Sequence, residues 1–461
     1  MQSGDCGKNV EIFGYWVIIE EQTRENRKDE TVMRTNELML YKHIENGRIL
    51  EDMTFLMDHY DNEYYNSEDL KGLLFEVVNE LLEMTVSHGF EGNLWHNYLT
   101  YLLATHENAY STSCEITGEV EGSINFAALH DFVIFKELFD YDFTSMEEVL
   151  GADCLDMIRH YEGTSGHGKV FNKRIRDRIC ELSRHLANSA SPEQFKEIVT
   201  GFYKEFGVGK LGLHKAFRIE HTEEGARIVP ITKIAHVHLD DLVGYELAKK
   251  KLIDNTEAFV AGKRANNCLL FGDAGTGKST SIKAILNQYY DQGLRMIEVY
   301  KHQFQDLNDI IAQIKNRNYK FIIYMDDLSF EEFEIEYKYL KAVIEGGLER
   351  KPDNILIYAT SNRRHLIRET FRDKEDRDEE LHTNDTVQEK LSLVARFGVT
   401  IYFGKPAKKE FQEIVKTLAQ RNELAIPEEE LLLEANKWEL SHGGLSGRTA
   451  QQFIDYLMGT R

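Results

Sequence analysis

Proline and basic residues are scarce in this chain of 461 residues. Proline occurs only 5 times, glycine 32 times, and 42% of the residues are apolar, which excludes collagen, long proline-rich linkers and extended disorder. Lys and Arg total 55 against 78 Asp and Glu, and the resulting net charge of −23 disfavours general binding to nucleic acid or anionic membranes. The length suits a folded chain of about three domains.

Paired cysteines and long apolar runs are also lacking. The five cysteines, at positions 6, 114, 154, 180 and 268, include no C-x-x-C pair and no closely spaced metal-ligand set, so we expect reduced thiols. The longest apolar runs, near Phe321–Met325 and Ile355–Ala359, are only strand-sized, and the first residues lack a signal-peptide core. The sequence therefore predicts a cytoplasmic protein without a membrane segment.

Four regions follow from the pattern along the chain. Residues 1–206 are expected to be mostly helical, because apolar residues recur at helical spacing from Leu70 to Leu82 after Ser67, and because Ser191-Pro192-Glu193-Gln194 is a helix start. Residues 207–238 are rich in glycine and charge, which is typical of a connector. We expect an α/β domain over residues 239–403 and a helical region over residues 404–461.

Short β-rich runs alternate with helical stretches in the third region, which predicts an α/β fold with a parallel sheet wrapped by helices. The expected strands are Cys268–Phe271, Met296–Val299, Phe321–Met325, Ile355–Thr360 and Val399–Phe403.

A complete G-x-x-x-x-G-K-[ST] motif lies between the first of these strands and a predicted helix. Its glycines let backbone amides turn toward phosphate oxygens, while Lys278 would reach the β and γ phosphates and the Ser279 hydroxyl would bind Mg²⁺. ATP and Mg²⁺ are therefore the expected ligands. The motif comprises Gly272, Asp273, Ala274, Gly275, Thr276, Gly277, Lys278 and Ser279, followed by Thr280 in the first helical turn.

A second glycine-rich segment, Gly163-Thr164-Ser165-Gly166-His167-Gly168-Lys169-Val170, matches only the first part of this motif. Valine replaces the hydroxyl that would bind magnesium, and no strand precedes the segment. We interpret it as a loop between helices.

Acidic and amide side chains end the next strands. Asp326 and Asp327 follow Phe321–Met325, so we expect Asp326 to contribute to the magnesium site and Asp327 to orient or deprotonate the attacking water. The strand Ile355–Thr360 is followed by Ser361 and Asn362.

A phosphate loop, an acidic strand end and a strand followed by Asn occur in this order in AAA+ ATPases, and the chain resembles them. The resemblance implies a three-layer core with a small helical lid. It gives Asn362 the sensor 1 position and Arg448 the sensor 2 position in the lid. Arg396 takes the position of the arginine finger that completes a neighbouring subunit's site. A structural ion pair for Arg396 and a solvent-facing side chain for Arg448 are the alternatives.

The same resemblance implies that Val243 and Gly244, within Leu239–Tyr245, contact the adenine. More narrowly, four segments are similar to the bacterial domain-of-unknown-function family 815 of AAA+ ATPases over roughly residues 200–461, and nothing functional carries over to residues 1–200. These segments are Asn266–Gly272, Met325–Glu331, Glu345–Glu349 and Ala359–Leu366.

One departure from the wider AAA+ pattern concerns Asp327, which stands where a glutamate is usual. Its shorter side chain would hold the carboxylate farther from a water, so hydrolysis would be slow unless Glu331 assists.

The first functional hypothesis is a Mg²⁺-dependent ATPase that couples ATP hydrolysis to motion of the lid and of neighbouring subunits, and so acts on an unidentified protein partner. Because Arg396 would work in trans, this hypothesis implies a homo-oligomer. A nucleotide-gated binding module or scaffold with little turnover is the alternative, and a P-loop kinase is a third.

Overall fold

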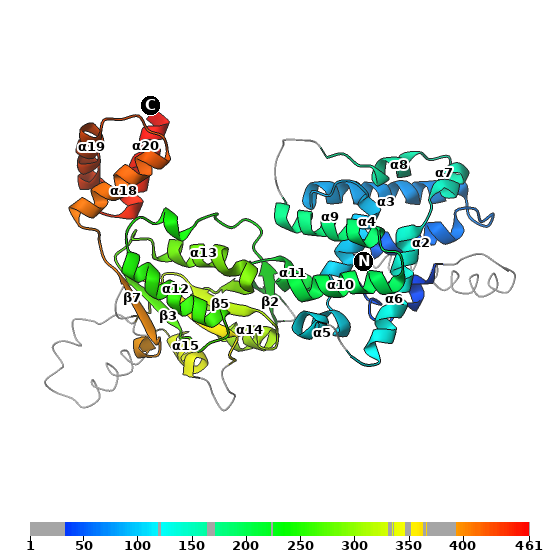
Figure 1. The fold of residues 1–461 in the computed structure, drawn as a ribbon, viewed down its shortest axis with the longest axis horizontal. Coiled ribbons are helices and arrows are strands. Elements are labelled where there is room, and N and C mark those ends of the chain that lie inside the picture. Colours follow the sequence, from blue (N-terminus) through cyan, green and yellow to red (C-terminus); the bar gives the residue numbers. More distant parts are fainter. Residues whose placement is uncertain are drawn as a thin grey trace, which may run out of the picture. The chain divides into compact units, whose positions relative to one another are not determined.

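The computed structural model describes residues 33–118, 121–163, 171–222, 225–330, 334, 336–345, 352–362, 366 and 393–460. The chain divides into two compact units, residues 1–204 and 205–461 (Figure 1). Parts of the segments named above lie outside the described residues. They are Cys6, residues 164–170 of the second glycine-rich segment, Glu331, residues 346–349 and residues 363–365.

The first unit is helical, as its sequence predicts. After a short 3₁₀ turn at Arg34–Glu37 (η1), its helices are α2 (Arg48–His59), α3 (Ser67–Ser87), α4 (Leu94–Thr105), α5 (Ala109–Thr117), α6 (Ile124–Asp140), α7 (Thr144–Leu150), α8 (Cys154–Arg159), α9 (Lys173–Ala187) and α10 (Pro192–Phe206), whose last two residues belong to the second unit.

Helix α3 contains the apolar stripe that the sequence indicates. Leu70, Leu74, Val77 and Leu81 are buried. The N-cap is Asn66, one residue before the expected Ser67, and its side chain accepts from the backbone amide of Glu68. Either side chain can cap a helix, so the choice depends on which residue has the extended backbone conformation that capping requires.

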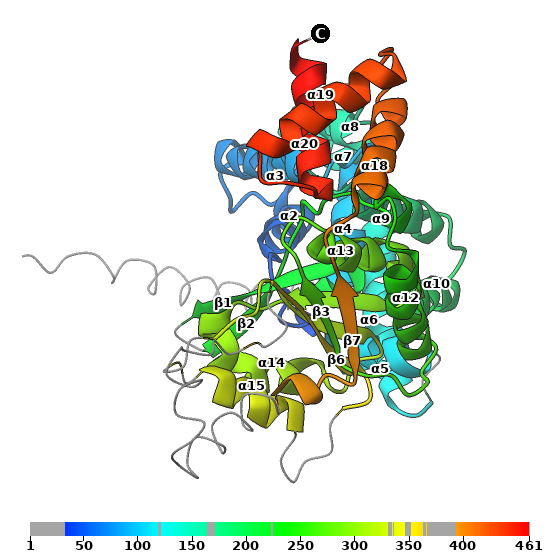
Figure 2. The same cartoon turned by 90° about the vertical axis from the view of Figure 1, so that its left-hand side faces the viewer.

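A seven-stranded sheet forms the centre of the second unit, in the order β2-β1-β4-β5-β6-β3-β7. Figure 2 labels strands β1, β2, β3, β6 and β7 of this sheet. All neighbouring strands are parallel except β1 and β2. The strands are β1 (Ala216–Thr222), β2 (Gly225–Pro230), β3 (Cys268–Gly272), β4 (Leu294–Glu298), β5 (Lys320–Met325), β6 (Ile355–Ser361) and β7 (Val399–Phe403).

The structure differs from the connector expected over residues 207–238. This segment contains the short helix α11 (Gly209–Leu213) and strands β1 and β2, which extend the sheet beyond β4. Phe217 and Ile219 are buried, while Arg218 and Glu220, which alternate with them, are exposed. This alternation is typical of a half-buried strand, but the neighbouring charges and glycines mask it in the sequence.

Helices cover both faces of the sheet, which confirms the expected three-layer α/β fold. Helices α12 (Glu246–Val260) and α13 (Lys278–Tyr289) pack on the face that contains Ile322 and Tyr324 of β5. Helices α14 (Leu307–Ile314) and α15 (Glu336–Glu345) pack on the face that contains Phe321 and Ile323. Three short 3₁₀ turns connect these elements: η2 (Leu239–Asp241), η3 (Tyr290–Gln292) and η4 (Lys301–Asp306).

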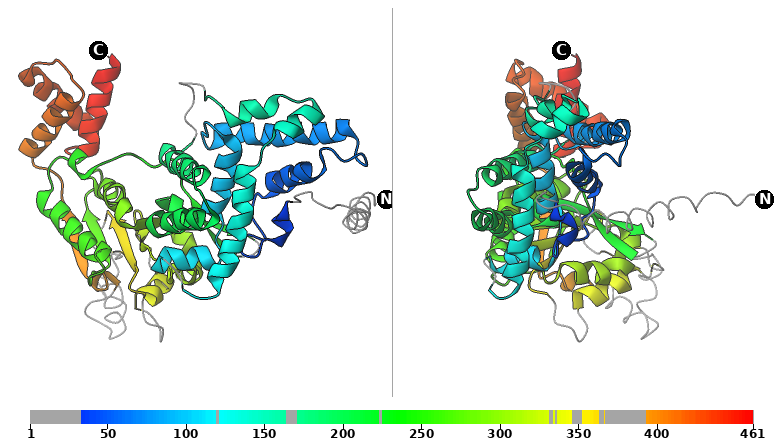
Figure 3. Two further views of the ribbon diagram at one scale, coloured as in Figure 1. Left: turned by 45° about the vertical axis from the view of Figure 1, so that its right-hand side comes forward. Right: turned by 90° about the vertical axis from the view of Figure 1, so that its right-hand side faces the viewer.

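The helical lid follows β7 (Figure 3). It has its own apolar core. It consists of α18 (Lys408–Arg421), α19 (Glu428–Ser441) and α20 (Gly447–Thr460). Phe411 and Phe453 are buried between its helices. The Ser446 hydroxyl accepts from the Thr449 amide at 3.1 Å, so Ser446 caps α20.

Within the described residues, no helix combines the length and apolarity that crossing a membrane requires. Cys114, Cys154, Cys180 and Cys268 are free thiols.

Candidate functional site

The phosphate loop connects β3 to α13. Gly272 has φ +136° and a Cβ there would overlap the Phe403 carbonyl oxygen, while Gly277 has φ +93° and a Cβ there would overlap Leu242. Both positions therefore require glycine, for conformation and for space. Ala274 is exposed, whereas Thr276 is buried and donates to the Asp273 carbonyl at 2.8 Å. Thr280 lies in the first turn of α13.

The Lys278 ammonium folds back over the loop. Its Nζ donates to the carbonyl oxygens of Gly272 at 3.0 Å and Asp273 at 2.6 Å, and to Oδ1 of Asn362 at 2.9 Å. Burial lowers the pKa of Lys278, and the carboxylates of Asp327, Asp273 and Asp326 offset part of this effect. A phosphate entering the loop would replace these neutral acceptors with charged ones.

Ser279 and Asp326 are joined directly. The Ser279 hydroxyl donates to Oδ1 of Asp326 at 2.7 Å, and the buried Thr360 hydroxyl donates to the same oxygen at 2.5 Å. Desolvation raises the pKa of Asp326, but the hydrogen bonds from Thr360 and Ser279 oppose it, and the pKa lies below its usual value. Asp326 is therefore ionised at neutral pH.

Asp327 faces Asn362 across the ends of β5 and β6. Nδ2 of Asn362 donates to Oδ1 of Asp327 at 2.8 Å, and the Asp327 amide donates to the Thr360 hydroxyl at 2.9 Å. Asp327 has φ +48°, a left-handed conformation that Asp tolerates better than most residues. This backbone turn gives the two consecutive carboxylates different neighbours.

The donor set at Ser279 and Asp326 fits a magnesium ion. A hydroxyl and an ionised carboxylate already lie within hydrogen-bonding distance of each other, and both are hard oxygen ligands of the kind that Mg²⁺ prefers. Neither side chain is fully buried. In contrast, no cluster of three or more His, Cys, Asp or Glu suited to a metal occurs in the described part of the chain.

The segment expected to contact adenine borders the phosphate loop. Leu242 lies against Gly277, and Val243 packs against the apolar core of the lid. Gly244 has φ +81°. The buried Lys249 of α12 donates to the Leu242 carbonyl at 2.9 Å and so fixes the course of this segment.

The lid contacts the loop through Arg448. The Arg448 amide donates to the Gly275 carbonyl at 3.1 Å, and its exposed, charged side chain contributes to the lowered pKa of Lys278. Just before the lid, the Asp273 carboxylate accepts from the Lys405 amide at 3.0 Å.

Arg396 lies apart from these residues. It stands in the turn before β7, where Val399 pairs with Cys268 at the start of β3, whereas Phe403 pairs with Gly272 at the phosphate loop. A five-residue strand is about 13 Å long, so Arg396 is at the opposite edge of the sheet from the loop. The structure brings together all the other predicted site residues, with Val243 and Gly244 reaching the loop through Leu242.

Two contributors were missed in the sequence. Thr360 binds both the Asp326 carboxylate and the Asp327 amide. Arg421 at the end of α18 donates to the carbonyl oxygens of Asp240 at 2.5 Å and Asp241 at 3.1 Å, next to the adenine segment. The position of Thr360 near a strand end is only a weak sequence signal that it belongs to the site. No local sequence signal exists for Arg421, because its partners are far away in the sequence.

Known proteins resemble parts of the chain. The replication factor C large subunit of Staphylothermus marinus is 34% identical over 85 residues, which are 18% of this chain and 19% of that protein. Among solved structures, a RuvB variant of Thermotoga maritima (18% identity, TM-score 0.34) and PCH-2 of C. elegans (17% identity, TM-score 0.35) each match 48% of this chain and 65% of their own. The chain thus spans about a fifth of the length of the replication factor C subunit and less than two thirds of the RuvB and PCH-2 chains.

A phosphate loop after β3, an acidic pair after β5, an asparagine after β6 and a separate helical lid define the P-loop fold of the AAA+ class. Within this class, residues 212–461 match the family described as protein of unknown function DUF815. The match covers more than half of the 461 residues, and the chain belongs to this family.

Proposed function

We propose that the chain is a Mg²⁺-dependent ATPase that couples ATP hydrolysis to motion of its lid and thereby acts on a protein partner. One observation carries this proposal: a continuous set of hydrogen bonds links Lys278, Asn362 and Asp327 at the mouth of the phosphate loop. The Lys278 ammonium, which would bind phosphate, is thus hydrogen-bonded to the Asn362 amide. That amide is in turn hydrogen-bonded to the Asp327 carboxylate, and the amide and the carboxylate would both contact the attacking water.

Each residue has a chemical role in this proposal. The loop amides and Lys278 bind the phosphates, and Arg448 approaches them from the lid. Asp327 accepts a proton from, or orients, the attacking water, and Asn362 positions that water together with Asp327. Val243 and Gly244 contact the adenine, and Asp273, Ala274, Gly275, Thr276 and Thr280 shape the loop.

Ser279 and Asp326 would hold Mg²⁺, which when bound neutralises phosphate charge. Thr360 keeps the Asp326 carboxylate ionised and oriented through its hydrogen bond.

The lid is the moving part in this proposal. It contacts the nucleotide site at the Gly275 carbonyl and at Asp240 and Asp241, so rearrangement of the loop on ATP binding or hydrolysis changes the contacts that hold it. A partner bound to the lid would then respond to the nucleotide state.

Arg396 is proposed to act in trans. It precedes β7 at the edge of the sheet opposite the phosphate loop, which is too far to reach its own nucleotide but compatible with a site on a neighbouring copy. An arginine supplied in this way neutralises charge on the transferring phosphate. The proposal therefore includes a homo-oligomer in the ATP state, working in the cytoplasm without general binding to nucleic acid.

A nucleotide-gated scaffold is the second candidate, and the short side chain of Asp327 favours it. Aspartate is shorter than the glutamate usual at this position, so its carboxylate would reach a water less well. ATP would then bind and change the lid without rapid turnover.

ATP hydrolysis measured over a wide range of protein concentrations tests the proposal, with Lys278→Ala and Arg396→Ala as comparison variants. Specific activity that rises with concentration and is lost in both variants supports the oligomeric ATPase. ATP binding without turnover at every concentration supports the scaffold, and no ATP binding contradicts both.

A further inference from the structure

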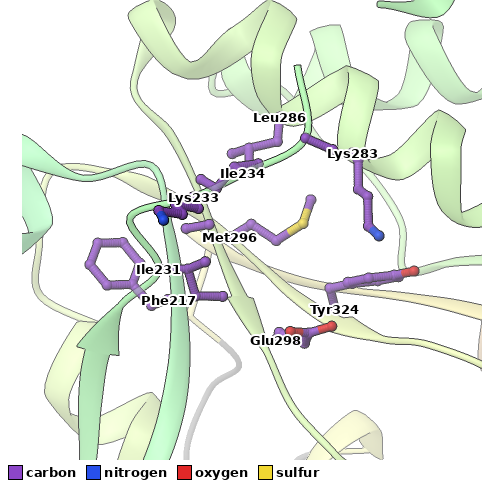
Figure 4. A pocket seen from close by; sticks show the side chains of 11 residues that line it. Phe217, Ile231, Lys233, Ile234, Lys283, Leu286, Met296, Glu298 and Tyr324 are labelled. Carbon is purple, nitrogen blue, oxygen red and sulfur yellow. The ribbon is translucent and has the colours of Figure 1, made fainter. Parts of the chain in front are cut away.

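A cavity of about 170 Å³ lies beside the nucleotide site, on the sheet face that α13 covers (Figure 4). One wall, which follows β2, is formed by Ile231, Lys233, Ile234 and Ala235, and side chains from β4, β5 and α13 form the others. An apolar cavity of about 150 Å³ is large enough to hold a benzene-sized molecule. The cavity is therefore large enough for a small organic molecule.

The walls have an apolar part and a polar part. Phe217, Ile231, Ile234 and Met296 form the apolar part, with Lys233 beside them, while Lys283, Glu298 and Tyr324 lie toward the other side of Met296 (Figure 4). Ligand pockets commonly combine apolar walls with a few polar groups that fix the orientation of the ligand.

The polar groups do not satisfy each other. Lys283 and Glu298 face the same cavity, yet within the described chain Lys283 forms no ion pair, and the Glu298 carboxylate accepts from the Tyr300 hydroxyl at 3.2 Å. The Tyr324 ring lines the cavity, but its hydroxyl is buried on the side of Asp326, Ser279 and Thr360.

These groups define the charge pattern of a ligand. Lys283 is a donor suited to a carboxylate, and Glu298 is an acceptor suited to an ammonium group. A molecule that carries both charges at one end and an apolar group at the other would pair both side chains and fill the apolar part.

We propose that this cavity binds a free α-amino acid with an apolar side chain, with its carboxylate on Lys283 and its ammonium on Glu298. The apolar side chain then lies among Ile231, Ile234 and Met296. Binding at this site needs no nucleotide.

Occupancy of the cavity would reach the nucleotide site through Tyr324. Its ring lines the cavity, and its hydroxyl is close enough to Asp326 to help lower the pKa of that carboxyl group. This coupling rests on the proposed function, whereas binding of the amino acid does not.

Equilibrium dialysis of the full chain against radiolabelled L-leucine, without nucleotide, tests the site. Saturable binding is expected, and Lys283→Met and Glu298→Gln should each weaken it about tenfold or more, because each removes a charge-assisted hydrogen bond. Lys250→Met on α12 is the matched control, since Lys250 is exposed and is not among the lining residues, and binding should not change. Ile234→Trp should abolish binding by filling the apolar part without changing the charge.

Two leucine analogues separate the charge contributions. 4-Methylpentanoate lacks the ammonium group and 3-methylbutylamine lacks the carboxylate, so both should bind at least about tenfold more weakly than leucine. Equal binding of either analogue overturns the zwitterionic ligand. No saturable leucine binding at millimolar concentration, or binding that survives Ile234→Trp, overturns the site. A lack of ATPase activity would contradict the proposed function only. The dialysis result would still decide whether the amino-acid site exists.

Discussion

The side-chain nitrogen of Asn362 donates to the Asp327 carboxylate across 2.8 Å, at the point where β5 and β6 end beside the phosphate loop. The oxygen of the same amide accepts from Lys278 at 2.9 Å. The neutral Asn362 side chain thus lies between the Lys278 ammonium and the Asp327 carboxylate, which would otherwise attract each other directly. Entry of phosphate would draw Lys278 away and leave the amide and the carboxylate to hold a water.

Asp327→Asn should abolish ATP turnover while nucleotide binding is retained. The substitution removes the carboxylate that orients or deprotonates the water but keeps its size and its position near Asn362. Turnover is measured by phosphate release and affinity by titration with a fluorescent ATP analogue. Asp309→Asn, at an exposed position of α14, is the control. Unchanged turnover in Asp327→Asn would remove this residue from the mechanism.

Thr360→Val should slow turnover about 10- to 100-fold, the range typical of residues that orient a metal ligand. Valine keeps the shape but loses the bonds to the Asp326 carboxylate and the Asp327 amide. Thr360→Ser keeps the hydroxyl and should restore most of the activity. A variant that folds normally and turns over like the parent would show that Thr360 has no positioning role.

The same variant should change the pH dependence. The pKa of Asp326 is below its usual value partly because Thr360 donates to it, so Thr360→Val raises that pKa. The acid limb of the turnover profile should therefore move to higher pH. For stability, the hydrogen bonds to ionised Asp326 contribute above its unfolded pKa of about 3.9 and are lost as pH falls below it. An acid limb at the same pH in both proteins would contradict this cause.

Much of this arrangement could be predicted from the sequence because its signals are local. The phosphate loop requires glycine at Gly272 and Gly277, and buried parallel strands appear as apolar runs such as Phe321–Met325. Strands β1 and β2 were missed because their alternating patterns are short and lie among glycines and further charged residues. Contacts such as Arg421 with Asp240 depend on how the lid packs, and no local pattern encodes that packing.

Arg421→Ala should weaken ATP binding about tenfold, because its guanidinium donates to two backbone carbonyls beside the adenine segment. Without these bonds, the segment and α18 lose a direct link, although Val243 still packs in the lid core. Lys409→Ala, an exposed residue of α18, should leave affinity unchanged. Calorimetric titration with ATP measures the affinity of both variants. An equal ATP affinity in Arg421→Ala and Lys409→Ala would show that Arg421 does not organise the nucleotide site.

Arg295→Met should lower the free energy of unfolding by about 3 kcal/mol, since it leaves buried carbonyls without a charged donor. The buried guanidinium lies 4.1 Å from the Tyr290 ring centroid and 4.3 Å from that of Tyr319, and it donates to the carbonyls of Leu211 and Gly212. Urea unfolding followed by circular dichroism measures the loss. Arg218→Met, on the exposed side of β1, should change stability little. Equal urea midpoints for Arg295→Met and the unmodified protein would mean that the packing of methionine compensates for the lost hydrogen bonds of Arg295.

Mixing two inactive variants should restore ATPase activity if Arg396 acts across a subunit interface. Lys278→Ala removes the phosphate-binding cation from its own site but keeps Arg396, and Arg396→Ala keeps an intact phosphate loop. In a mixed oligomer, some sites combine a normal Lys278 with a normal Arg396 from the neighbour, so phosphate release should reappear. Titrating one variant into the other at constant total protein measures this recovery. Lys409→Ala, added in the same way, is the control, and the total activity should then rise only in proportion to the amount of Lys409→Ala present. If Arg396 serves its own subunit, or only forms a structural ion pair, no ratio of the two variants recovers activity, because every site still lacks one of the two cations.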